Sequence, residues 1–226
     1  MNSTVLITGA NRGIGLGLAQ RYNNTHHVLF TCRSANAVDA VKAQLPNPDQ
    51  STGLVLDVAD EQSIQRAVED IQQHSVTIDL LINNAGIIQQ EASSVLEVSD
   101  HDMLAHFNVN TLGALRMIQY VHPLMRDGGA IYNITSRMGQ LSSMGSNHCA
   151  YRVSKSALNA LTLILADALA HRTIRVNAIC PGWVQTDMGG PHAHLTIAES
   201  CSQIMATIAN EEWNGQFLHN NEVIPW

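Results

Sequence analysis

Residues 5–15 read Val5-Leu6-Ile7-Thr8-Gly9-Ala10-Asn11-Arg12-Gly13-Ile14-Gly15. The first three are a short apolar run, typical of a buried strand, and a helix-compatible stretch follows the glycines. Glycine lets the backbone approach a ligand closely, and the free amides at the start of a helix face negative charge. We therefore expect a pyrophosphate-binding turn formed by Gly9, Asn11, Arg12, Gly13, Ile14 and Gly15. The alternative is a turn that serves only close helix packing, because the spacing G-x-x-x-G-x-G differs from G-x-G-x-x-G.

The rest of the chain alternates short apolar runs with longer helix-compatible stretches. The runs cover residues 5–7, 28–30, 53–56, 80–82, 130–134 and 174–179. Such alternation predicts βαβ units and hence a Rossmann-like α/β fold, a doubly wound three-layer sandwich with a mainly parallel central sheet of about seven strands. Residues 215–226 should add the last strand, with a turn at Asn220-Asn221. Ligands of such sheets bind at the carboxyl ends of the strands.

Composition limits the classes of protein that the chain can belong to. The 226 residues are 45% hydrophobic, enough for one sizeable core, and no linker interrupts them, so we expect a single domain over residues 1–226. A net charge of -7 with no run of Lys or Arg argues against a nucleic-acid partner. The four cysteines form no C-x-x-C pair, and no long apolar segment is present. We expect a cytoplasmic protein that does not enter a membrane.

The candidate catalytic residues lie around Tyr151 and Lys155, which are four positions apart and therefore adjacent on one helical face. A nearby ammonium group favours the phenolate, so we expect the pKa of Tyr151 to fall from about 10 to about 8. Ser136 closes the fifth predicted strand, where its hydroxyl could hold a substrate carbonyl oxygen. Each feature alone also occurs by chance, in a helix or as a turn residue.

The end of the second predicted strand bears on the choice of nicotinamide cofactor. An Asp or Glu there would bind the ribose 2′-hydroxyl of NAD(H), but residues 31–34 contain no acid. Arg12 and Arg33 could together face the 2′-phosphate of NADP(H), since guanidinium groups bind phosphate through paired hydrogen bonds. This favours NADP(H), the alternative being that both arginines are solvated surface charges.

Taken together in order and spacing, these motifs resemble the short-chain dehydrogenase/reductase family over essentially the whole chain. The motifs are Gly9 to Gly15, Asn83-Asn84-Ala85-Gly86, Asn110, Ser136, Tyr151 with Lys155, and Pro181-Gly182. More narrowly, residues 150–159, residues 181–190 and the terminal Trp226 are similar to sniffer-type carbonyl reductases and bacterial C-factor proteins.

The resemblance implies further roles. It implies that the cofactor lies along Asp57, Val58, Asn83, Ala85 and Gly86 at its adenosine end and along Pro181, Gly182, Val184 and Thr186 at its nicotinamide end. Asn110 would be the fourth catalytic residue, which holds a helix carbonyl and a water that leads to Lys155, and Asn108 is the second candidate for this role. The implied reaction is NADPH-dependent reduction of an aldehyde or ketone, with Tyr151 as the general acid.

Other readings stay open. C-factor-like relatives suggest a nucleotide-binding signalling or sensor protein with little turnover, and a 3-oxoacyl thioester reductase would need a basic docking patch for its carrier. The apolar helix after Tyr151 and the one near residues 100–125 predict a homodimer, with a tetramer as the alternative. Extra residues before Tyr151 and the Asn220-Asn221-Glu222 turn depart from the family pattern, and a short region after Thr186 predicts an open substrate pocket. His192 and His194 lack the companions of a metal site, so no metal is expected.

Overall fold

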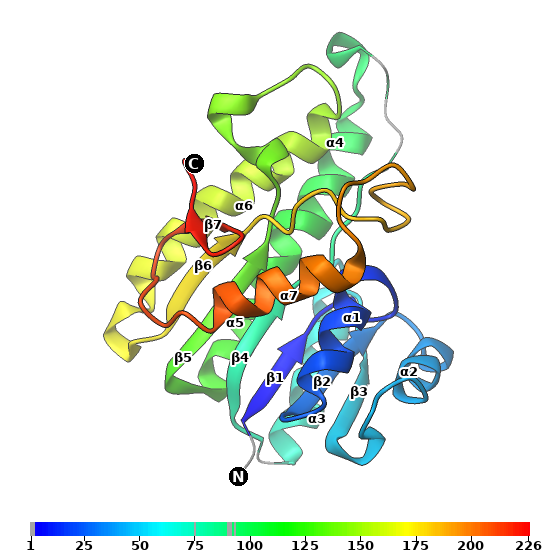
Figure 1. Cartoon of the computed structure of the whole chain (residues 1–226), viewed down its shortest axis with the longest axis vertical. Coiled ribbons are helices and arrows are strands. Elements are labelled where there is room, and N and C mark those ends of the chain that lie inside the picture. Colours follow the sequence, from blue (N-terminus) through cyan, green and yellow to red (C-terminus); the bar gives the residue numbers. More distant parts are fainter. Residues whose placement is uncertain (1–2, 75, 90–91, 93) are drawn as a thin grey trace.

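The computed structural model describes residues 3–74, 76–89, 92 and 94–226, and an eight-stranded sheet forms the centre of this part (Figure 1). The strand order is β3-β2-β1-β4-β5-β6-β7-β8, and every pairing is parallel except that of β7 with β8. The strands are β1 (Thr4–Ile7), β2 (His27–Cys32), β3 (Ser51–Val55), β4 (Ile78–Asn83), β5 (Met125–Ile134), β6 (Arg175–Ile179), β7 (Phe217–His219) and β8 (Glu222–Val223). The predicted Rossmann-like α/β class is confirmed.

Side chains alternate along each buried strand, and because those on both sides are apolar, helices cover both faces of the sheet. Val5 and Ile7 of β1 pack toward α1 (Gly13–Tyr22), α2 (Ala35–Lys42) and α7 (Ile197–Ile208). Leu6, between them, packs toward α3 (Glu61–Gln73), α5 (Gly113–Val121) and α6 (Cys149–Ala168) on the other face. None of the helices in the described part of the chain combines the length and apolar character of a membrane span.

Short helical turns connect these elements. They are η1 (Pro48–Gln50), η2 (Val95–Glu97), η4 (His122–Leu124), η5 (Arg137–Gly139), η6 (Leu141–Ser143) and η7 (Ala170–Arg172). The long helix expected near residues 100–125 is α4 (Asp100–Phe107), a π-helical turn η3 (Asn108–Leu112) and α5 in succession. A π turn inserts one extra residue per turn and is often found at functional sites.

The carboxyl-terminal segment forms a hairpin. Asn220 and Asn221 both adopt a positive φ, 47° and 63°, as the two central residues of a tight hairpin turn do. The turn predicted at these residues is confirmed, and it separates β7 from β8, so the segment contributes two strands where one was expected. The additional strand accounts for eight strands instead of about seven.

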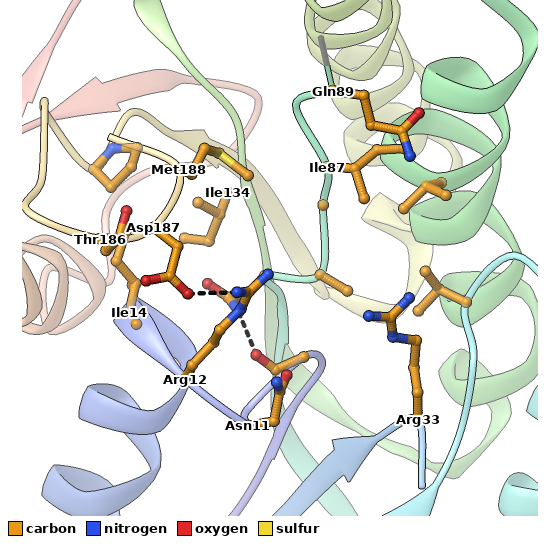
Figure 2. A pocket seen from close by; sticks show the side chains of 18 of the residues that line it. Asn11, Arg12, Ile14, Arg33, Ile87, Gln89, Ile134, Thr186, Asp187 and Met188 are labelled. Carbon is orange, nitrogen blue, oxygen red and sulfur yellow. Dashed lines mark hydrogen bonds and ion pairs between the residues drawn. The ribbon is translucent and has the colours of Figure 1, made fainter. Parts of the chain in front are cut away.

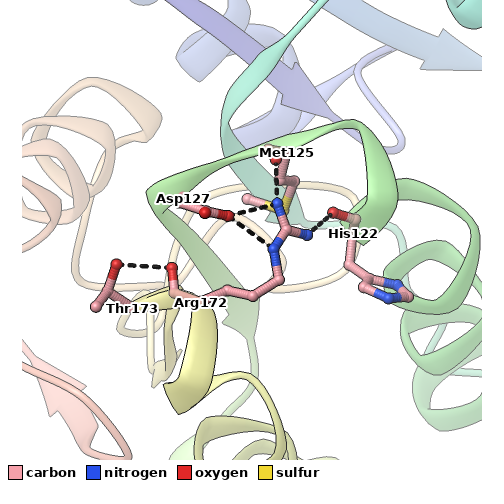
Figure 3. A network of polar contacts seen from close by, with 5 residues as sticks. All are labelled: His122, Met125, Asp127, Arg172 and Thr173. Carbon is pink, nitrogen blue, oxygen red and sulfur yellow. Dashed lines mark hydrogen bonds and ion pairs between the residues drawn. The ribbon is translucent and has the colours of Figure 1, made fainter.

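One arginine holds the start of β5, at the end of the sheet away from the strands' carboxyl ends (Figure 3). The guanidinium group of Arg172 donates to Asp127 Oδ1 and to the backbone oxygens of His122 and Met125, each at 2.7 Å. These bonds tie the turn after α5 and the start of β5 to the turn that precedes β6. The network is structural and lies away from the cleft described next.

Candidate active site

A cleft of about 990 Å³ opens at the carboxyl ends of the strands, beside the point between β1 and β4 where the strand order reverses. Its walls come from the β1–α1 turn, the ends of β2, β3, β4 and β5, and the loop after β6. Of the predicted site residues, those that line it are Gly9, Asn11, Arg12, Gly13, Ile14, Arg33, Asp57, Val58, Ala85, Gly86, Tyr151, Lys155, Pro181 and Thr186. Gly15, Asn83, Asn110, Ser136, Gly182 and Val184 do not line it, and each is placed separately below.

The β1–α1 turn has the form of a phosphate cradle. Gly9 and Gly13 have φ of 67° and 59°, a region that other residues rarely adopt. A Cβ on Gly13 would stand 3.4 Å from the Thr186 side chain on the opposite wall, so a side chain there would narrow the cleft. Gly15 lies behind the turn, where a Cβ would meet Gly9 O at 2.4 Å. The bare backbone at the start of α1 therefore fits the pyrophosphate of a dinucleotide.

The end of β4 is held against this turn by Asn84, to which the sequence motifs alone assign no separate role. Asn84 donates from Nδ2 to the backbone oxygens of Thr8 and Gly9, at 2.9 and 3.1 Å, and Thr8 Oγ1 accepts from the amides of Asn84 and Ala85. Asn83, by contrast, is buried and donates to Asn133 Oδ1 at 2.9 Å, away from the cleft. Because successive strand residues point to opposite sides, Asn84 faces the cleft where Asn83 points into the interior, and the sequence alone does not say which of the two adjacent asparagines does so.

The two arginines expected to face a 2′-phosphate occupy different positions (Figure 2). Arg12 forms an ion pair with Asp187 of the loop after β6, and both side chains are exposed. Arg33 extends from the end of β2 into the cleft and makes no hydrogen bond or ion pair with another described residue. Both arginines line the cleft, but the Arg12 guanidinium group is held by Asp187, so Arg33 is the better placed of the two to bind a phosphate.

Tyr151 and Lys155 line the cleft, and Ser136 lies next to Tyr151 just outside this lining. Lys155 Nζ lies 5.9 Å from the centroid of the Tyr151 ring and donates to Ile134 O at 2.8 Å. The hydroxyl of Tyr151 is hydrogen-bonded to Ser136. Ser136 follows β5 by two residues and caps η5, with its Oγ accepting from the amide of Met138 at 3.1 Å. The spacing expected of a helical i, i+4 pair is thus present, with the serine hydroxyl against the phenol.

The electrostatic expectation for this pair is wrong in this structure. Burial raises the pKa of Tyr151 to about 12, although the hydrogen bond with Ser136 acts in the opposite direction. Burial also lowers the pKa of Lys155 to about 8. Both groups are desolvated, which disfavours their charged forms, and this effect exceeds the attraction that would stabilise a phenolate beside an ammonium. Tyr151 therefore keeps its proton at neutral pH.

Asn110 lies in the π turn η3 and is buried. Its side chain accepts from the amide of Ile87 at 2.8 Å and donates to Ile87 O and to Ser154 Oγ, each at 2.9 Å. Ser154 lies on α6 between Tyr151 and Lys155, so this amide ties the end of β4 to the catalytic helix. The helix carbonyl that the resemblance implied is not among these partners.

Two further contacts place Asn110 relative to the cleft. A Cβ on Gly86 would lie 3.1 Å from Asn110 Oδ1 and 3.5 Å from Lys155 Nζ, so both groups border the same small space. Asn108, the second candidate, instead accepts from Arg116 at 2.8 Å and lines the cleft farther along. The geometry favours Asn110 as the residue near Lys155.

The loop after β6 forms the other wall. Gly182 adopts a φ of 83°, and Val184 is buried and bridges to Leu195, so these two residues shape the loop and do not face the cleft. Trp183 is half exposed, its Nε1 donates to Gly189 O at 2.7 Å, and its ring packs edge-on against His194. Within the described ranges, no group of three or more His, Cys, Asp or Glu side chains is arranged to hold a metal ion.

Comparisons with known proteins agree with this arrangement. The chain matches the short chain dehydrogenase family model over residues 3–194. It is 34% identical over 193 residues to carbonyl reductase family member 4 from Danio rerio. This alignment covers 83% of this chain and 78% of the relative.

Two solved structures match the full length of both chains with a TM-score of 0.90. They are the NADPH-bound carbonyl reductase from chicken fatty liver, at 31% identity, and the carbonyl reductase Sniffer of D. melanogaster, at 30% identity. The matched family model, the cradle at the β1–α1 turn and the Ser136–Tyr151–Lys155 group together show that this chain belongs to the short-chain dehydrogenase/reductase family.

Proposed function

We propose that this protein is an NADP(H)-dependent reductase that converts an aldehyde or ketone to an alcohol, with Tyr151 as the general acid. The observation that carries the proposal is the contact of the Tyr151 hydroxyl with Ser136 beside Lys155, in the same cleft as the glycine turn. A donor hydroxyl, a polarising hydroxyl and a nearby cation are the groups that a carbonyl needs as its oxygen gains charge.

The residues divide the work as follows. Bound NADPH would supply the hydride to the carbonyl carbon. Tyr151, protonated at neutral pH because its pKa is about 12, donates its hydroxyl proton to the carbonyl oxygen as charge develops there. Ser136 orients that oxygen, and the Lys155 ammonium stabilises the phenolate that remains. Asn110, bordering the space beside Lys155, would hold the water through which the phenol regains its proton.

NADP(H) as the cofactor is supported from two sides. The chicken carbonyl reductase, which matches this chain over its full length, carries bound NADPH. In this chain the end of β2 offers Arg33, which pairs with no other residue that the structure describes, and residues 31–34 contain no carboxylate. A guanidinium group attracts a 2′-phosphate dianion, whereas the carboxylate that favours NAD(H) would repel it.

We also propose a homodimer. Packed side by side, α4 and α6 carry large apolar side chains that are exposed, namely Leu104, Phe107, Val153, Leu163 and Ile164. Large exposed apolar side chains on neighbouring helices are typical of a protein–protein contact. A second copy of the same chain would bury it, in the manner of a symmetric interface.

The test is a turnover assay with a matched pair of variants. NADPH consumption is followed over aldehydes, ketones, quinones and a 3-oxoacyl thioester. We expect reduction of simple carbonyls, and Tyr151→Phe should lower kcat by about 100-fold or more, since general acid catalysis contributes about that much. Tyr120→Phe removes the same hydroxyl from a partly buried tyrosine whose partner is Glu61, outside the cleft, and should leave kcat unchanged. Tight NADPH binding with no turnover of any carbonyl would contradict the proposal and favour a nucleotide sensor.

A further inference from the structure

Cys180 stands where three neighbouring strands end. It follows β6 directly, and its Sγ accepts a hydrogen bond from the amide of Arg137, at 3.4 Å, just after Ser136. Its backbone is bound to β7 on the other side: its amide donates to Leu218 O at 2.8 Å, and its carbonyl faces His219 Nδ1 at 3.0 Å. Because a carbonyl oxygen only accepts, His219 carries a proton on Nδ1. A continuous series of contacts therefore leads from β7 through Cys180 to the residue after Ser136.

The thiol of Cys180 differs from the other buried thiols. Burial raises the pKa of Cys32 and of Cys201 to about 11. Burial acts on Cys180 in the same direction, but hydrogen bonds from His219 and from the amides of Gly182 and Arg137 lower its pKa below the usual value. The hydrogen bond with Cys180 in turn raises the pKa of His219. A thiol next to an imidazole that stabilises its thiolate behaves as an ionisable pair.

The pair of Cys180 and His219 affects the electrostatics of Tyr151 and Lys155 from the side away from the cleft. Cys180, when charged, raises the pKa of both Tyr151 and Lys155, which places it close enough to contribute to their electrostatics. Among the residues that the structure describes, Arg137 is a further charged group beside the pair, and its charge opposes protonation of His219. The thiol is buried and does not line the cleft.

We propose that Cys180 and His219 are a positioning pair for the reaction. The thiol holds the backbone that carries Ser136 against the Tyr151 hydroxyl, and its ionised form places a negative charge behind Tyr151 and Lys155, with His219 held beside it. This inference rests on the proposed function, because it concerns the acid of that reaction. It adds two residues that touch neither substrate nor cofactor.

The kinetic test compares Cys180→Ala with Cys180→Ser. Alanine removes the acceptor for the Arg137 amide, and we expect kcat/KM for carbonyl reduction to fall about tenfold through misplacement of Ser136. Serine keeps an acceptor of similar size and should recover most of that loss. Neither side chain forms a thiolate, so in both variants the alkaline fall of kcat/KM should begin at lower pH than in the wild type. A loss of rate with no displacement of the pH profile would mean a packing role only and would overturn the proposal.

A second readout does not depend on turnover. With ¹³C-labelled histidine, the His219 resonance is the one that is missing from the His219→Gln spectrum. It should titrate at higher pH in the wild type than in Cys180→Ala, because the thiol raises the pKa of His219. An unchanged titration would overturn the pairing. If the titration moves as expected but no carbonyl is reduced, the pair stands and the proposed function fails. Thermal unfolding of each variant identifies any that is misfolded. If a Cys180 variant is misfolded, the pH profile of His219→Gln, which keeps a donor for Cys180 O, is compared with that of the wild type instead.

Discussion

Replacing Gly15 by Ala tests the structural role of the cradle. A Cβ at Gly15 would lie 2.4 Å from Gly9 O and 2.5 Å from Asn84 Nδ2, about 1 Å short of ordinary contact on both sides. The turn must move outward, which overpacks the region at a cost of about 1–3 kcal/mol. It must also stretch the bonds from Asn84 to Thr8 O and Gly9 O, each worth about 1 kcal/mol. We expect the free energy of unfolding to fall by about 3 kcal/mol, which for a chain of this size lowers Tm by roughly 6–12 °C.

The same displacement should weaken NADPH binding. Loss of one charge-assisted bond from a backbone amide to the pyrophosphate costs about 2 kcal/mol, or roughly thirtyfold in Kd. Urea unfolding followed by circular dichroism measures the stability, and NADPH fluorescence measures the affinity. Gly128→Ala is the control: its φ is 81°, its Cβ would meet only Thr173 at 3.8 Å, and it lies at the start of β5, so it should lower stability and leave Kd unchanged. If Gly15→Ala bound NADPH as tightly as the wild type, the assignment of this turn as the cradle would be refuted.

Three further outcomes are expected. Arg33→Ser should weaken NADPH binding by about tenfold and NADH binding very little. Arg12→Ser removes a side chain held by Asp187 and should change the ratio of the NADPH and NADH affinities less. Equal effects of the two variants would contradict the assignment of Arg33 as the residue that binds the 2′-phosphate. Burial lowers the pKa of Lys155 to about 8, so its ammonium group is present below that pH and lost above it. We therefore expect kcat/KM for reduction to be level below about pH 8 and to decline above it. A profile that stays level well into the alkaline range would exclude the Lys155 ammonium as the group that stabilises the phenolate. Ile164→Glu combined with Leu104→Glu places charge on exposed positions of α6 and α4, so light scattering after gel filtration should report a monomer for this variant and the proposed dimer for the wild type. A variant that is still a dimer would place the interface elsewhere.

The order of the elements and the main parts of the site follow from the amino-acid sequence by itself. Short apolar runs located β1 to β6 to within a few residues, since a buried parallel strand must be apolar on both faces. Glycine spacing after β1 located the turn, and the four-residue spacing of Tyr151 and Lys155 put them on one helical face. The pair Asn220-Asn221 also predicted the hairpin turn, because asparagine is one of the few residues that tolerate a positive φ. All of these are local properties, carried by neighbours along the chain.

What the sequence could not supply depends on residues that are distant along the chain and adjacent in space. The pairing of Arg12 with Asp187, the inward turn of Asn83 beside Asn133 and the contact of Cys180 with His219 each join separate elements. Asn110, in the π turn η3, is bonded to Ile87 and Ser154, and no local sequence pattern predicted this turn. The pKa of Tyr151 went the opposite way to expectation because burial is a property of the folded chain. Local periodicity and turn chemistry act within a few residues, whereas desolvation and long-range hydrogen bonds exist only once the layers have packed.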